Sequence, residues 1–127
     1  MDNTTFYHFD NKTLCIITSR ATGQKFIGEA NWDGTGEFSE KIGEEIASRR
    51  AYIEILRYLR ESSRETEFTM NILLTDMKQS KKYNAKSYEA KNLRRALWEA
   101  TDARKTFNEM IQEEKRALQF YIKVKCK

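Results

Sequence analysis

The first 32 residues contain three short runs, of which the first and third alternate between apolar and polar positions and the second is largely apolar. Residues 4–9 (TTFYHF), 13–20 (TLCIITSR) and 25–32 (KFIGEANW) are rich in the β-branched and aromatic side chains that favour strands. Residues 10–12 and 21–24 separate the runs and contain Asp, Asn and Gly, which are typical of turns. This pattern predicts an N-terminal antiparallel meander.

From residue 39 the apolar positions follow the period of a helix instead. Ser39 is placed to cap a helix N-terminus, and Glu40 suits its first turn. We expect this helix to end in the low sixties or as far along as residue 78, with residues 62–68 the favoured place for a bend. A second helix is predicted over residues 85–116.

The last apolar run, residues 118–126 (LQFYIKVKC), alternates again and predicts a strand that closes the N-terminal sheet. The expected class is therefore α+β: a small antiparallel sheet, made of the meander plus this closing strand, with two long helices. At 127 residues the chain is expected to be a single domain spanning residues 1–127. No run approaches the roughly 20 apolar residues of a membrane span, so no membrane partner is expected. Cys15 and Cys126 are interpreted as reduced thiols, which predicts a cytoplasmic location.

Arginines stand within the apolar stripes of both predicted helices. Arg49 lies near the centre of a stripe on the first helix, with Arg60 on the same line, and Arg104 lies near the centre of a stripe on the second. An unpaired buried charge costs several kcal/mol. Two explanations stay open: glutamates of a neighbouring helix neutralise the arginines, or the arginines line a cleft and bind an anionic ligand through bidentate hydrogen bonds.

A different face of the second helix carries Tyr88, Lys91, Arg95 and Trp98, nearly opposite its apolar stripe. Aromatic and basic groups at this spacing suit stacking on a base while a phosphate is held. They suit a subunit interface equally well, and the two interpretations merge if a ligand binds between subunits. The two helix arguments together nominate these ligand-binding candidates: Arg49, Tyr88, Asn92, Arg95, Trp98, Arg104 and Asn108.

Other motifs do not indicate catalysis. The turn at residues 33–36 (DGTG) lacks the phosphate-loop pattern and is interpreted as a structural joint. His8 is interpreted as a core or edge histidine, and the carboxylates form no pair suited to acid–base work. Two cysteines and one histidine make no convincing zinc site. We expect neither enzymatic activity nor a cofactor.

The net charge of the chain gives only a weak indication of its partner. The net charge is +4, from 23 Lys and Arg against 19 Asp and Glu, which permits an anionic partner such as a nucleotide. Lys78, Lys81, Lys82, Lys86 and Lys91 form a run that could contact nucleic acid, but solvated lysines in a connecting loop explain it as well. Nucleic acid is therefore not expected as the partner.

A family resemblance adds a specific function. Residues 28–51 follow the order G-x-A … D-x-x-x-E-F-S-E-x-I-G-x-x-I-A-x-x-R-A, a joint common in small phage proteins where a meander leads into a helix. The whole layout resembles the Thoeris anti-defence proteins of the first class. That resemblance implies a non-enzymatic sponge that sequesters cyclic ADP-ribose isomers without cleaving them. It implies pockets between protomers, where an aromatic ring stacks on adenine and arginine and asparagine side chains bind the ligand.

The expected function is thus a phage anti-defence sponge for cyclic nucleotide signals, foremost of the glyco-cyclic ADP-ribose type and possibly including cyclic oligonucleotides. The expected assembly is a homo-oligomer, a dimer or larger, with ligand between protomers. The resemblance assigns no individual pocket residue, so the candidates above come from the helix faces alone. The alternative is a small phage-encoded DNA- or protein-binding factor.

Overall fold

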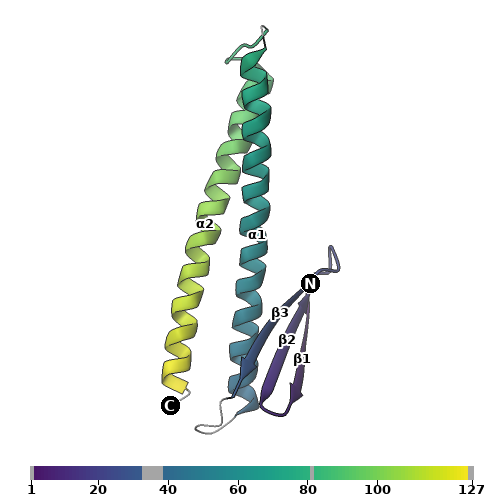
Figure 1. Cartoon of the computed structure of the whole chain (residues 1–127), viewed down its shortest axis with the longest axis vertical. Helices are drawn as coiled ribbons and strands as arrows, with labels where there is room; N and C mark the ends of the chain where they lie inside the picture. The colour runs from purple at the N-terminus through teal and green to yellow at the C-terminus, as the bar shows by residue number, and fades with distance from the viewer. Residues whose placement is uncertain (1, 33–38, 81, 126–127) are drawn as a thin grey trace. The chain divides into compact units, whose positions relative to one another are not determined.

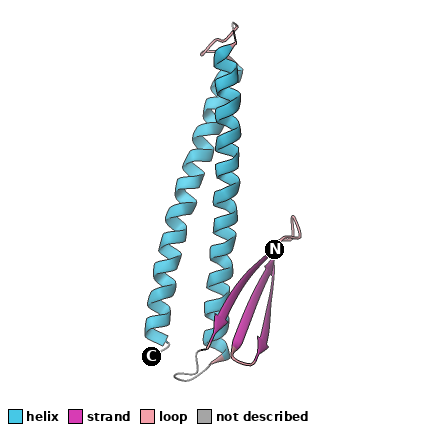
Figure 2. Cartoon of the chain, viewed as in Figure 1, coloured by secondary structure: helices cyan, strands magenta, loops and turns pink. Residues whose placement is uncertain are grey.

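The computed structural model describes residues 2–32, 39–80 and 82–125. It contains three strands, β1 (Asn3–Phe9), β2 (Lys12–Thr18) and β3 (Lys25–Asn31), followed by two helices, α1 (Glu40–Gln79) and α2 (Tyr88–Lys125) (Figures 1 and 2). The predicted α+β class, meander and pair of long helices are confirmed. The chain divides into two compact units, which are described separately below. The sheet unit comprises Met1–Leu56 and Met110–Lys127, and the hairpin unit comprises Arg57–Glu109.

The meander pairs β1 with β2 and β2 with β3, all antiparallel. Cys15 at the centre of β2 lies opposite Phe6 on one side and Gly28 on the other. Asp10 turns the chain between β1 and β2 with a φ of 51°, and Gly23 does so between β2 and β3 with a φ of 74°. Asp and Gly both tolerate this left-handed conformation, which explains the turn signals read from the sequence.

Small residues bring the sheet against the first part of α1. Gly28 and Ala30 on β3 are buried, as are Gly43, Ala47 and Ala51, which recur every four residues on α1. A Cβ atom added at Gly28 would collide with the backbone carbonyl oxygen of Ala47 and the backbone nitrogen of Ala51. We call these five residues the small-residue seam. They explain the G-x-A and G-x-x-I-A-x-x-R-A pattern as a packing requirement between strand and helix.

The predicted C-terminal closing strand is wrong, because α2 continues as a helix to Lys125. A strand would have placed Phe120, Ile122 and Val124 on one face. Phe120 and Val124 are exposed, whereas Leu118 is buried and Ile122 is half-buried, which is the spacing of a helix. Residues 88–125 contain no Gly or Pro to stop the helix. The sheet has three strands in the part of the chain that the structure describes.

Serines cap both helices. The backbone oxygen of Ser39 accepts a hydrogen bond from Gly43 at 2.9 Å, and its Oγ lies 3.5 Å from the amide of Ile42, which confirms the predicted N-cap. Ser87 does the same for α2, with its Oγ 3.2 Å from the amide of Ala90. The first helix, α1, ends at Gln79, close to the later of the two ends expected from the sequence. The DGTG turn lies outside the described residues.

None of the helices in the described ranges has a stretch long and apolar enough to cross a lipid bilayer.

Candidate functional site

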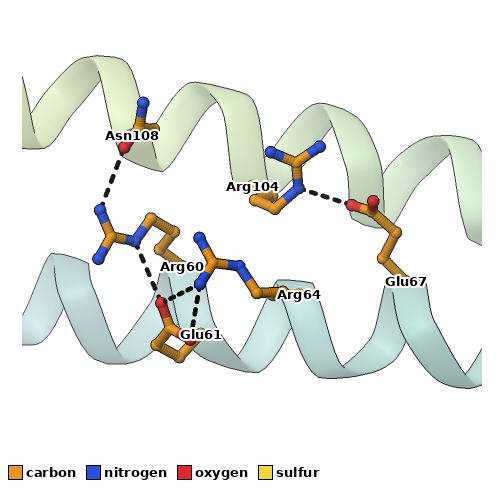
Figure 3. Close-up of polar contacts among 6 residues, drawn as sticks. All are labelled: Arg60, Glu61, Arg64, Glu67, Arg104 and Asn108. Atoms are coloured by element: carbon orange, nitrogen blue, oxygen red, sulfur yellow. Dashed lines mark hydrogen bonds and ion pairs between the residues drawn. The ribbon is translucent and has the colours of Figure 1, made fainter.

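Arg104 lies in an ion pair inside the hairpin unit. Its Nε donates to the Glu67 Oε2 of α1 at 2.7 Å (Figure 3). This hydrogen bond, assisted by the positive charge, holds the pKa of the Glu67 carboxyl below its usual value. Of the two explanations left open by the sequence, the structure shows the first for Arg104: a glutamate from the neighbouring helix neutralises it.

Asn108 and Arg60 form a second polar contact in the same unit. Arg60 Nη1 donates to Asn108 Oδ1 at 3.1 Å (Figure 3). The Nε of Arg60 lies 3.4 Å from Glu61 Oε1, close enough for attraction, yet it is buried and forms no hydrogen bond. Arg64 also pairs with Glu61, at 3.1 Å. Asn108 thus uses its side-chain oxygen to hold an arginine of α1.

Arg49 belongs to the sheet unit. Its Nε donates to Glu45 at 2.7 Å, one helical turn earlier, and its guanidinium lies 5.3 Å from the centre of the Tyr121 ring of α2. The second contact is a cation–π interaction, which suits the planar guanidinium. Both contacts occupy Arg49 with groups of its own unit.

His8 joins the sheet to α1, in keeping with its interpretation as a structural histidine. Its Nε2 lies 3.2 Å from Glu44 Oε1, and its Nδ1 lies 3.3 Å from the hydroxyl of the buried Thr13. Burial, together with the nearby charge of Glu44, raises the pKa of the Cys15 thiol, which keeps that thiol neutral and a poor nucleophile. Among the described residues no group of three or more His, Cys, Asp or Glu is placed to hold a metal ion.

Four of the seven candidates share one exposed face of α2 in the hairpin unit. Tyr88 is 77% exposed and Trp98 is 67% exposed, and Asn92 and Arg95 are exposed between them. Spacings of three and four residues place these side chains, with the exposed Lys91, on one side of the helix. We call these five residues the aromatic–basic face. It combines two unburied rings with cations and an amide.

No protein-family model, curated protein or solved structure matches this chain. Function is therefore inferred from the side chains themselves. Arg104 and Asn108 contribute to helix–helix contacts, and Arg49 belongs to the other unit. Of the seven candidates, the two exposed aromatic side chains, Tyr88 and Trp98, both lie on the aromatic–basic face.

Arg94, which helical periodicity does not distinguish from its neighbours, shapes the turn before α2. Its guanidinium donates to the backbone oxygen of Ala85 at 2.5 Å and reaches the Tyr83 hydroxyl at 3.4 Å. Such contacts join residues 9 and 11 positions apart across an irregular segment, where helical periodicity gives no information. The local density of positive charge around residues 82–95 was the one signal in the sequence that pointed to this segment.

Proposed function

We propose that this chain is a non-enzymatic sponge that binds and sequesters a cyclic nucleotide signal of the glyco-cyclic ADP-ribose type. The observation that supports this proposal is the aromatic–basic face. A nucleotide offers a flat base and anionic phosphates. The exposed rings of Tyr88 and Trp98 provide stacking surfaces, while Lys91 and Arg95 provide positive charge beside them. Stacking of one base on an aromatic side chain is worth about 1–3 kcal/mol.

The face alone is open to solvent, so we propose that a second copy of the chain covers the bound ligand. Trp, Tyr and Arg are the usual anchors of protein interfaces, and Trp98, Tyr88 and Arg95 provide all three types within three turns of α2. Binding between protomers would bury both the rings and the ligand. The sponge therefore acts as a homo-oligomer, and the same face serves subunit contact and ligand contact.

In this proposal Arg104 and Asn108 do not contact the ligand but stabilise the packing of α2 against α1. Each is bonded to a side chain of α1, Arg104 to Glu67 and Asn108 to Arg60. Arg49 keeps the sheet unit together through Glu45 and Tyr121. These three residues therefore affect ligand binding only indirectly, by stabilising the fold.

The test is a titration calorimetry experiment with a glyco-cyclic ADP-ribose isomer, followed by heat denaturation and chromatography of the released ligand. A sponge binds tightly and returns the ligand intact. Recovery of a cleaved product would replace the proposal with an enzymatic function. Absence of both heat and recovered ligand would refute it for this ligand class.

Assembly is tested in parallel by measuring the molar mass in solution with and without ligand. The proposal expects a dimer or larger assembly that is stabilised by ligand. A monomer that binds the ligand at full affinity would contradict the part of the proposal that places the ligand between protomers.

A further inference from the structure

The positive charge of the chain is concentrated in one segment. Residues 76–98 hold seven Lys and Arg against two Asp and Glu, a net charge of +5. The remaining residues hold 16 Lys and Arg against 17 Asp and Glu, a net charge of −1. The mild overall value of +4 therefore averages a strongly basic segment with a neutral remainder. Such asymmetry is typical of a surface that binds a polyanion.

Several cations of this segment are also free of carboxylate partners within the described part of the chain. Two of the arginines that lie in apolar stripes are held by glutamates, Arg49 by Glu45 and Arg104 by Glu67. By contrast, Lys82, Lys86 and Arg95 are exposed, and none of them forms an ion pair with a described residue. Cations that no carboxylate neutralises can neutralise phosphates of a partner instead.

The turn that carries these cations is held in shape. Ser87 caps α2, and the guanidinium of Arg94 donates to the backbone oxygen of Ala85. Asn84 accepts a hydrogen bond from the backbone amide of Lys86 at 3.0 Å. The N-terminus of α2, with its positive end of the helix dipole, therefore stands beside Lys86. We call Lys78, Lys82, Lys86, Lys91, Arg94 and Arg95 the basic turn.

We infer that the basic turn, together with the rings of Tyr88 and Trp98, is a binding surface for single-stranded nucleic acid. Residues 88 and 98 are about 15 Å apart along a helix, and the turn lysines extend the charged surface further. That length matches several phosphates of a strand, which carries one charge per roughly 3.4 Å in B-form geometry. Exposed rings bind unstacked bases, so they favour a single strand over a duplex.

This inference goes beyond the sponge activity. A ligand of one or two nucleotides would contact only part of the surface, mainly the aromatic–basic face. A strand would in addition contact Lys78, Lys82 and Lys86, which lie on the turn side of Tyr88. It also differs from the expectation drawn from the sequence, which recognised the run of lysines but did not expect nucleic acid as the partner.

The test is fluorescence anisotropy with a labelled 15-nucleotide oligo(dT) at 50 to 200 mM NaCl. If about four phosphates are neutralised, the logarithm of the affinity falls with a slope near −3 against the logarithm of salt concentration, which is roughly a 60-fold loss over this range. The double variant K82E/K86E is expected to bind at least tenfold more weakly and with a shallower slope. Trp98→Ala is expected to weaken binding without changing the slope.

The matched control is K123E/K125E, which makes the same charge change at exposed positions in the last turns of α2, within the sheet unit. It is expected to reduce affinity much less than K82E/K86E. Equal losses in the two variants would show that only net charge matters and would overturn the inference. No binding to oligo(dT) at 50 mM NaCl, tighter binding to duplex DNA, or equal competition by polyglutamate would also overturn it.

The strand-binding surface and the sponge activity can be tested independently. K82E/K86E should keep its affinity for the cyclic nucleotide, because these lysines lie outside the aromatic–basic face. Binding of oligo(dT) without binding of the cyclic nucleotide would refute the sponge alone. Binding of the cyclic nucleotide without oligo(dT) would refute the strand surface alone.

Discussion

Two arginines of the sheet unit, Arg49 and Arg50, and three cations of the basic turn differ in whether they have a partner within the fold. In the sheet unit Arg49 binds Glu45, and Arg50 Nη1 donates to the backbone oxygen of Glu29 at 2.7 Å. In the basic turn Lys82, Lys86 and Arg95 are exposed and pair with no described carboxylate. The type of residue therefore does not by itself indicate function. A cation that already has a partner within the fold contributes to structure, whereas one without such a partner is available to a ligand.

The two regions also differ in side-chain size. The small-residue seam buries Gly28, Ala47 and Ala51 where backbones meet. The aromatic–basic face exposes Tyr88 and Trp98, two of the three most exposed large aromatic residues of the hairpin unit, the third being Phe68. Close packing should make the first region sensitive to any added atom. The second should tolerate truncation and lose only binding.

The largest expected effect is at the seam. Gly28→Ala should destabilise the fold by about 3 kcal/mol, because its Cβ meets backbone atoms of α1 that no side-chain rotation can move. Urea unfolding followed by circular dichroism measures the change. The control is Gly23→Ala, at a φ of 74° with no atom within 4 Å of the added Cβ. It should cost only about 1 kcal/mol, from backbone strain. Equal losses would refute close packing at Gly28.

The next effect concerns the cap of the helix that carries the aromatic–basic face. Ser87→Ala should reduce the free energy of unfolding by about 1 kcal/mol, because it removes the acceptor of the Ala90 amide. Ser39→Ala should cost less, since the corresponding contact is longer, at 3.5 Å. Ser62→Ala, at an exposed position inside α1, should have little effect or stabilise slightly. A larger loss at Ser62 than at Ser87 would contradict the capping role.

A smaller effect should depend on pH. The pKa of Glu67 is lowered in the folded state by the hydrogen bond from Arg104, so the pair contributes stability above the unfolded-state pKa of about 4.3. That contribution is lost as the pH falls through the lower folded-state pKa. Glu67→Gln should therefore be less stable than the wild type at pH 7, and the difference should shrink below about pH 4.

The control for this comparison is Glu65→Gln, at an exposed position of α1 two residues away. Both variants remove one negative charge, so the difference between their pH profiles isolates the Arg104 pair. A profile for Glu67→Gln that matches that of Glu65→Gln would show that the pair does not stabilise the folded state.

Local signals were sufficient to predict the meander, the two helices and the Ser39 cap. Each strand is a short β-branched or aromatic run bounded by turn residues, so no distant contact is needed to recognise it. The prediction of a closing strand was wrong. Leu118, Phe120, Ile122 and Val124 alternate with polar residues as in a strand, but α2 has no residue that would end the helix before them. Continuation of a long helix was the stronger tendency.

The candidate site was predicted where it needed only the geometry of one helix. Tyr88, Asn92, Arg95 and Trp98 share a face because of their spacing alone. The partner of Arg104 could not be chosen in this way, because Glu67 is 37 positions away and the pairing depends on how the two helices align. Sequence periodicity placed Arg104 in an apolar stripe but left open whether a glutamate or a ligand neutralises it.

The most direct test of the central claim is calorimetric titration of the glyco-cyclic ADP-ribose isomer into the wild type, Trp98→Ala and Phe120→Ala. Trp98 and Phe120 are similarly exposed, at 67% and 70%, but Phe120 lies outside the aromatic–basic face. We predict that Trp98→Ala binds at least tenfold more weakly, a loss of about 1.4 kcal/mol, with its unfolding free energy unchanged within about 0.5 kcal/mol. Phe120→Ala should bind like the wild type. Equal affinity in all three proteins would contradict the placement of the ligand on the aromatic–basic face.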